Sequence, residues 1–149
     1  MRPPRIVKII RIDPFWITTL WTNGEVRLND FSGKLAQFAA NARWQKLTDF
    51  EEFRQVTVAE GDTLTWPNLQ FPNTKGNLTP VAFDPDVLYA ESQPVDAPAV
   101  IEIDPEHEFT QADYARRNGL APSKVRTWVR RGKLKSRYVP HLDLTLVVE

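Results

Sequence analysis

The segment that decides the fold is residues 110–135, which read TQADYARRNGLAPSKVRTWVRRGKLK. Thr110 suits the N-cap of a helix because its hydroxyl can accept a backbone N–H, and Asp113 follows three residues later, as in a capping box. Gly119 suits the left-handed residue after a helix, and Pro122 suits the first position of the next one. The sequence therefore predicts two helices joined by a tight turn: Gln111–Asn118 and residues 122–131.

Small and apolar residues stand where the two helices of a helix-turn-helix cross, namely at Ala115, Gly119, Leu120, Val125 and Trp128. The opposite face of the second helix and the residues after it are polar and basic. Arg and Lys side chains on such a helix can read guanine or hold phosphates. The candidate DNA-binding residues are Ser123, Lys124, Arg126, Thr127, Arg130, Arg131, Lys133, Lys135 and Arg137.

The formal net charge is zero, but the two ends of the chain differ. Residues 1–104 carry 10 Lys/Arg and 14 Asp/Glu, whereas residues 105–149 carry 9 Lys/Arg and 5 Asp/Glu. All nine of these later cations fall within residues 116–137, where no acidic residue occurs. This asymmetry favours a polyanionic partner for the C-terminal part. The alternative is a helical hairpin whose basic face is merely solvated or docks on protein.

The C-terminal segment resembles the helix-turn-helix of excisionase-like and MerR-like regulators. Their Ala, Gly, Val and Trp, followed by R-R-G-K-L, appear here at Ala115, Gly119, Val125, Trp128 and residues 130–134. Two positions depart from that pattern: Asn118 replaces an apolar residue, and Ala121 replaces the usual Ser or Thr cap. Two strands expected after the helices, Ser136–Val139 and Leu144–Val148, would form a wing.

Residues 1–91 predict a hairpin sheet with short helices. Asn23-Gly24 lies between two strand-like runs and indicates a type I′ hairpin. A first strand is expected over residues 6–12 and a further pair over 56–59 and 63–67, with irregular chain after Pro67. The expected helices cover residues 34–44, a short segment capped by Thr48, and a segment that begins at Asp84-Pro85.

This part resembles the bacterial domain-of-unknown-function family 2442. The matching residues are Trp21, Gly24, Leu47, Phe50, Phe53, Val56, Trp66, Pro67, Leu88 and Tyr89. The resemblance implies a compact α+β domain without an established activity, in a family often encoded near toxin–antitoxin-like genes. Residues 68–79 depart from it as an insert. The aromatic residues are interpreted as hydrophobic core: Trp16, Trp21, Phe31, Phe38, Trp44, Phe50, Phe53 and Trp66.

The predicted fold class is thus an α+β N-terminal domain, a hairpin sheet with short helices, followed by a small, winged helix-turn-helix domain. The expected boundaries are residues 1–91 for the first domain, 92–99 for a proline-bearing linker, and 100–149 for the DNA-binding domain, which would open with a strand at 100–103. We expect few core contacts to cross such a linker.

The sequence has no cysteine, no glycine-rich phosphate loop and no spacing typical of a catalytic or metal site, so neither an enzyme nor a cofactor is expected. It has no apolar run of membrane-spanning length, which favours a cytoplasmic protein. The leading hypothesis is a DNA-binding transcriptional regulator or antitoxin-like component that forms a homodimer on double-stranded DNA, with a partner protein on the N-terminal domain. The alternatives are an interaction module that binds a toxin-like protein without DNA and, more distantly, an RNA-binding protein.

Overall fold

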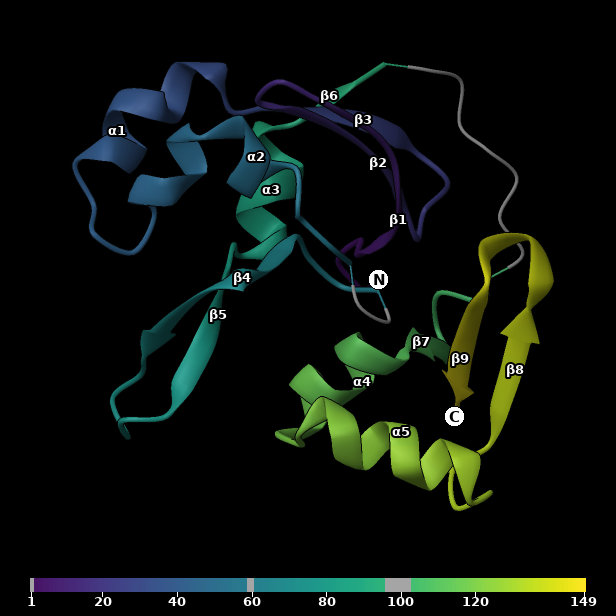
Figure 1. Ribbon diagram of the computed structural model, residues 1–149. Coiled ribbons are helices and arrows are strands. Elements are labelled where there is room, and N and C mark those ends of the chain that lie inside the picture. The colour runs from purple at the N-terminus through teal and green to yellow at the C-terminus, as the bar shows by residue number, and fades with distance from the viewer. Residues whose placement is uncertain (1, 59–60, 96–102) are drawn as a thin grey trace.

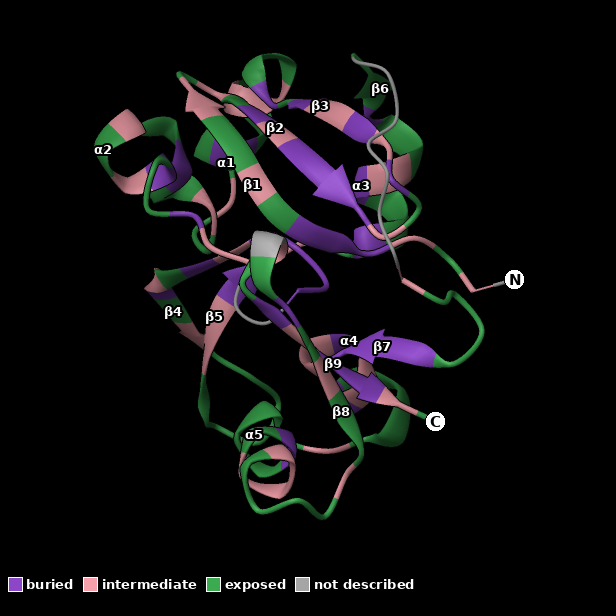
Figure 2. Cartoon of the chain, turned by 90° about the vertical axis from the view of Figure 1, so that its right-hand side faces the viewer, coloured by how far each residue is buried: buried purple, intermediate pink, exposed green. Residues whose placement is uncertain are grey.

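The computed structural model describes residues 2–58, 61–95 and 103–149. These residues form three antiparallel sheets with short helices around them (Figure 1). The N-terminal sheet has the strand order β1-β2-β3-β6. Its central strand β2 is buried over most of its length (Figure 2). The strands are β1 (Ile6–Asp13), β2 (Trp16–Trp21), β3 (Val26–Asp30) and β6 (Gln93–Pro94).

The β2–β3 connection is the predicted hairpin at Asn23-Gly24, but its turn type differs. Gly24 has a positive φ of 87° and Asn23 does not, whereas a type I′ turn requires a positive φ at both central residues. The Gly24 N–H donates to the Trp21 carbonyl at 2.9 Å, and the Trp21 N–H donates to the Glu25 carbonyl at 3.0 Å. The connection is therefore a longer loop in which glycine takes the left-handed position after a tight turn.

The helices of the first half differ in detail from the prediction. The helix expected over residues 34–44 is shorter, since α1 covers only Leu35–Ala39 and the chain then turns at Asn41. Helix α2 (Phe50–Phe53) is capped by Asp49 and not by Thr48, because the Asp49 carboxylate accepts the Glu51 N–H at 3.0 Å. Helix α3 (Pro85–Glu91) has the predicted Asp84 cap and Pro85 start. Two 3-10 turns complete this part: η1 (Ser32–Lys34) and η2 (Gln45–Thr48).

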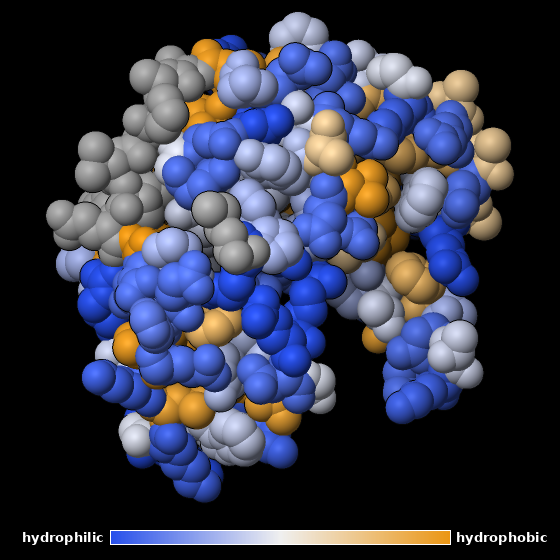
Figure 3. Space-filling view, turned by 180° about the vertical axis from the view of Figure 1, so that it is seen from behind, coloured by the Kyte–Doolittle hydropathy of each residue, from blue (hydrophilic) through white to orange (hydrophobic). Residues whose placement is uncertain are grey.

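Residues 65–82 form a two-stranded hairpin that we call the arm. It consists of β4 (Thr65–Pro72) and β5 (Leu78–Ala82) and projects from the body of the molecule (Figures 1 and 3). The prediction of irregular chain after Pro67 is wrong. A two-stranded sheet tolerates prolines because both of its strands are edges, where a missing N–H breaks no ladder.

The C-terminal elements lie where the local signals predict them. Helix α4 (Gln111–Asn118) follows the short strand β7 (Glu108–Thr110), and helix α5 (Pro122–Arg130) follows α4. Strands β8 (Ser136–Val139) and β9 (Leu144–Val148), joined by the 3-10 turn η3 (Pro140–Leu142), have the predicted bounds. The sequence did not predict that β7 pairs with β9. With β7, the β8–β9 hairpin becomes a C-terminal sheet of order β7-β9-β8.

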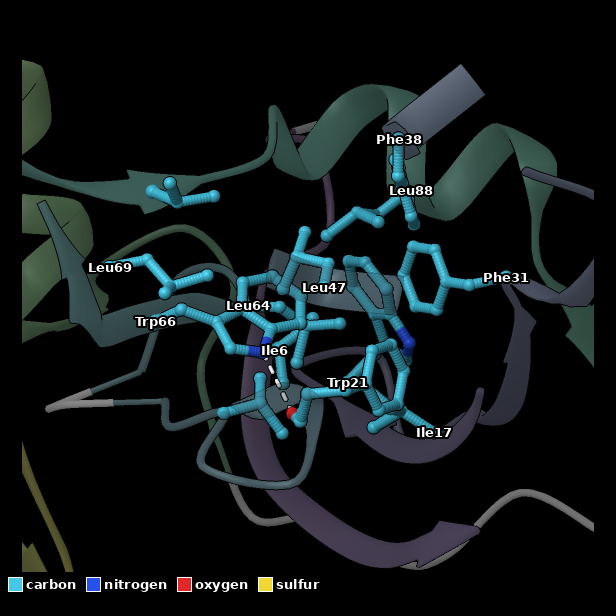
Figure 4. Close-up of a cluster of buried hydrophobic side chains, with 13 residues drawn as sticks. Ile6, Ile17, Trp21, Phe31, Phe38, Leu47, Leu64, Trp66, Leu69 and Leu88 are labelled. Atoms are coloured by element: carbon cyan, nitrogen blue, oxygen red, sulfur yellow. Dashed lines mark hydrogen bonds between the residues drawn. The ribbon is translucent and has the colours of Figure 1, made fainter. Parts of the chain in front are cut away.

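The main core lies between the N-terminal sheet, the helices and the base of the arm. Trp21 and Trp66 are fully buried in it, together with Phe38 and Phe53. Figure 4 shows Trp21, Phe38 and Trp66 among the buried side chains of this core, and the Trp66 indole N–H donates to the Phe53 carbonyl at 2.7 Å. The interpretation of the aromatic residues as core holds with one exception, since Trp16 is 45% exposed on the N-terminal sheet.

The predicted fold class is wrong. Instead of an α+β domain followed by a helix-turn-helix domain, the described residues are sheet-rich and form three antiparallel sheets with short helices. The expectation of few contacts between the two parts is also wrong. One buried cluster unites residues of the N-terminal sheet with residues of β8 and β9: Val7, Leu20, Val26, Val139, Leu144 and Leu146. The N-terminal sheet thus covers apolar residues of the β8–β9 hairpin, because the two short C-terminal helices alone do not cover them.

The segment predicted as a linker, residues 92–99, is partly a strand. Gln93 and Pro94 form β6 and pair with Leu28 and Arg27 of β3. Residues 96–99, and the predicted strand at 100–103 apart from Ile103, lie outside the described residues.

Candidate nucleic-acid interface

The start and end of α4 are fixed by local chemistry. The Thr110 hydroxyl accepts the Asp113 N–H at 3.2 Å, which caps the first turn. Gly119 ends the helix with φ of 63°, and the Leu120 N–H donates to the Ala115 carbonyl at 2.9 Å. This C-terminal motif redirects the chain within two residues, so that Pro122 can begin α5.

Helix α5 packs one apolar face on α4 and on the C-terminal sheet. Val125 is buried against Ala115 and Val147 in a small cluster to which Val129 and Leu134 add partly buried surface. Ala121 gives α5 no side-chain cap, as its sequence predicts.

The predicted crossing residue Trp128 does not belong to this cluster. It is half-buried, and the Lys124 ammonium lies 4.9 Å from the centroid of its ring. At 100° per residue Trp128 stands at the margin of the apolar face, which Val125 and Val129 occupy. An indole at such a margin can pack its ring and still meet solvent.

The remaining face of α5 carries the predicted DNA-binding residues. Most are exposed, and Figure 2 colours α5 mainly as exposed and intermediate. The exposed members are Ser123, Lys124, Arg126, Arg130, Arg131, Lys133 and Lys135, and Thr127 is half-buried. Within the described ranges, Arg130, Arg131, Lys133 and Lys135 make no ion pair with a carboxylate. Their charges are therefore available to a polyanion.

Arg137 differs from the other predicted DNA contacts because it pairs with a carboxylate of the protein itself. Its guanidinium donates to the Glu108 carboxylate from Nε at 2.6 Å and from Nη2 at 2.9 Å. This double hydrogen bond from Arg137 holds the pKa of the Glu108 carboxyl below its usual value. Arg137 thus ties β8 to β7 across β9.

The two arginines of α4 are likewise engaged. Arg116 Nη2 lies 2.6 Å from Asp62 Oδ2, and the Arg117 guanidinium lies 5.2 Å from the centroid of the Phe109 ring. The sequence alone did not show that Arg116 and Arg137 are paired within the protein, because their partners, Asp62 and Glu108, lie 54 and 29 residues away along the chain. The structure concentrates the available positive charge on α5 and on the loop that follows it.

A buried ionic network, which the sequence did not reveal, fixes α4 on the N-terminal sheet. Arg5 Nε lies 3.2 Å from Asp62 Oδ1 and 3.4 Å from Asp113 Oδ1, and its Nη1 lies 2.8 Å from Asp86 Oδ1. The side chains of Arg5, Asp62 and Asp113 are all about nine-tenths buried. Removing one member of such a network leaves an unpaired buried charge, so the network sets the position of α4 strongly.

No helix among residues 2–58, 61–95 and 103–149 combines the length and hydropathy needed to span a membrane. The same residues contain no cluster of three or more His, Asp or Glu side chains arranged to hold a metal ion. No protein-family model, no curated protein and no solved structure matches the chain.

Proposed function

We propose that this protein binds double-stranded DNA through the outward face of α5 and acts as a transcriptional regulator or an antitoxin-like component. The observation that carries the proposal is the division of the nine C-terminal cations. Arg116 and Arg137 pair with buried carboxylates, whereas the exposed cations Arg130, Arg131, Lys133 and Lys135 make no ion pair with a carboxylate among the described residues. A DNA-binding protein would act where the DNA is, which is the cytoplasm of a bacterial cell.

The geometry of α5 suits a groove of duplex DNA. Arg126, at the margin of the apolar face, and Arg130 are one helical turn apart, as are Ser123 and Thr127. An α-helix with its side chains is about 10–12 Å wide, and the major groove is about 12 Å wide. Arginine can donate two hydrogen bonds to guanine, and the hydroxyl groups can contact bases or phosphates.

The charge distribution of the whole chain supports one orientation on DNA. Residues 1–104 carry an excess of four acidic residues, and residues 105–149 carry an excess of four basic ones. Phosphates repel the first part and attract the second, so the encounter would bring α5 to the duplex.

The test is a binding titration of a fluorescent mixed-sequence duplex at low salt, read by anisotropy. The variant Arg130→Gln/Arg131→Gln removes two exposed cations that have no carboxylate partner among the described residues. We expect it to bind at least about tenfold more weakly, a loss of about 1.4 kcal/mol.

The matched control is Arg11→Gln/Arg54→Gln, which also removes two charges. These arginines have side chains that are 72% and 58% exposed, and they pair with Asp13 and Glu51 in the N-terminal part. The control should bind like the parent. Equal affinity of all three proteins, with unchanged circular dichroism, would reject DNA binding by α5 and favour a protein-docking helix.

A further inference from the structure

The arm projects from the same side of the molecule as the α4–α5 pair. In Figure 1 the arm descends at the lower left, and the α4–α5 turn faces it. In Figure 3, seen from behind, an open hollow separates the arm from the lobe that carries the C-terminal helices. A ligand bound along α5 and long enough to cross this hollow would reach the arm.

The tip of the arm is an ordered turn. The Asn73 Oδ1 accepts the Lys75 N–H at 2.9 Å and the Asn77 N–H at 3.1 Å. The Gly76 N–H donates to the Asn73 carbonyl at 3.0 Å, and the Asn73 N–H donates to the Asn77 carbonyl at 2.9 Å. These bonds hold the backbone while the side chain of Lys75 stays exposed.

The base of the arm is anchored in the core. Trp66 and Val81 face each other across the two strands and are buried, as is Leu69. Farther out, the Arg43 guanidinium lies 4.5 Å from the centroid of the Phe71 ring. An isolated two-stranded hairpin is only marginally stable, so these contacts are what keep the arm extended.

The surface chemistry of the arm suits a nucleic acid better than a protein strand. Residues 65–82 contain one charged residue, Lys75, and no acidic residue. Residues 72–78 are all exposed, and Leu78 is 71% exposed. Prolines at positions 67, 72 and 80 remove backbone donors from both edges, which opposes the addition of a partner's strand.

We propose that the tip of the arm is a second DNA contact, on the stretch of duplex next to the segment bound by α5. Lys75 would contact a phosphate, and Leu78 would lie against the sugar–phosphate backbone beside it. The inference rests on the proposed function of α5 and assigns a role to residues 68–79. It predicts a binding site longer than one helix can cover.

The experiment compares Lys75→Ala/Leu78→Ser with the parent on a long duplex and on a short duplex trimmed to the α5 site. On the long duplex we expect roughly 5- to 20-fold weaker binding, and a slope of log affinity against log salt that is smaller in magnitude by about 0.9. On the short duplex the two proteins should bind equally. Hydroxyl-radical footprinting should lose protection of sugars at one flank only.

The matched control is Lys8→Ala/Ile10→Ser, which removes an exposed lysine and a half-exposed apolar residue from β1. It should behave as the parent in every assay. Unchanged binding of Lys75→Ala/Leu78→Ser to the long duplex, while Arg130→Gln/Arg131→Gln binds weakly, would refute the arm contact and leave the function of α5 standing. Unchanged binding of both variants would refute both proposals.

Discussion

Gly61 offers a sharp test of how the N-terminal part is joined to α4. It has a φ of +79°, and a Cβ added there would lie 2.6 Å from Thr110 Cγ2 and 2.7 Å from Thr110 Cβ. Gly76 has the same φ of +79°, but a Cβ added there meets nothing within 4 Å. Comparing alanine variants of these two glycines therefore distinguishes the free-energy cost of the positive φ from the cost of pressing on Thr110, the N-cap of α4.

The left-handed conformation costs an L-residue about 1–2 kcal/mol, and both Gly61→Ala and Gly76→Ala should lose that amount. Gly61→Ala must also displace Thr110, and overpacking of this kind typically costs a further 1–3 kcal/mol or so. We expect Gly61→Ala to lower the free energy of unfolding by roughly 2–5 kcal/mol, against about 1–2 kcal/mol for Gly76→Ala.

The assay is urea unfolding followed by far-ultraviolet circular dichroism. Thr110→Ser removes the Cγ2 atom and should recover part of the loss in the double variant Gly61→Ala/Thr110→Ser. Equal losses for the two glycine variants, or a double variant whose losses simply add, would show that residue 61 does not press on the cap of α4.

Three further predictions concern the C-terminal sheet, the joined core and the assembly. Because the hydrogen bonds from Arg137 depress the folded pKa of Glu108, this pairing should stabilise the fold above the unfolded pKa of about 4.3 and fade as the pH falls through the folded pKa. Glu108→Gln should cost about 1.5–3 kcal/mol at pH 7 and progressively less as the pH falls below about 4.3, a contrast that pH-dependent urea curves would reveal or deny. The cluster that joins Val7 to Leu146 predicts coincident unfolding curves by tryptophan fluorescence and circular dichroism, whereas two separate transitions would contradict the shared core. We expect a homodimer on specific DNA, formed through exposed strand edges, and light scattering that gives one chain per duplex would reject it.

The C-terminal helices and the α3 cap were predictable because their signals are local. Thr110, Gly119, Pro122 and Asp84 each act within three residues of their own position. Such signals specify where an element begins or ends, whatever packs on it later.

The parts that failed depend on distant partners. Pairing of β7 with β9 joins residues about 40 positions apart, and the Arg5 network draws on Asp62 and Asp113. Local composition does not show that the N-terminal and C-terminal sheets share one core. Nor does it show that Arg116 and Arg137 pair with carboxylates of the protein itself. For this reason the sequence overestimated the separateness of the C-terminal part and the number of cations that face outward.

The most direct measurement is the dependence of DNA affinity on salt. Phosphate contacts release counterions, so log affinity falls linearly with log salt, with a slope of about −0.9 for each phosphate neutralised. The exposed cations are Lys124, Arg126, Arg130, Arg131, Lys133 and Lys135. If about four of them reach phosphates, the slope is about −3.6, and it becomes about 1.8 less steep in Arg130→Gln/Arg131→Gln. A flat salt dependence, or an equal slope in parent and variant, would contradict DNA binding by this helix.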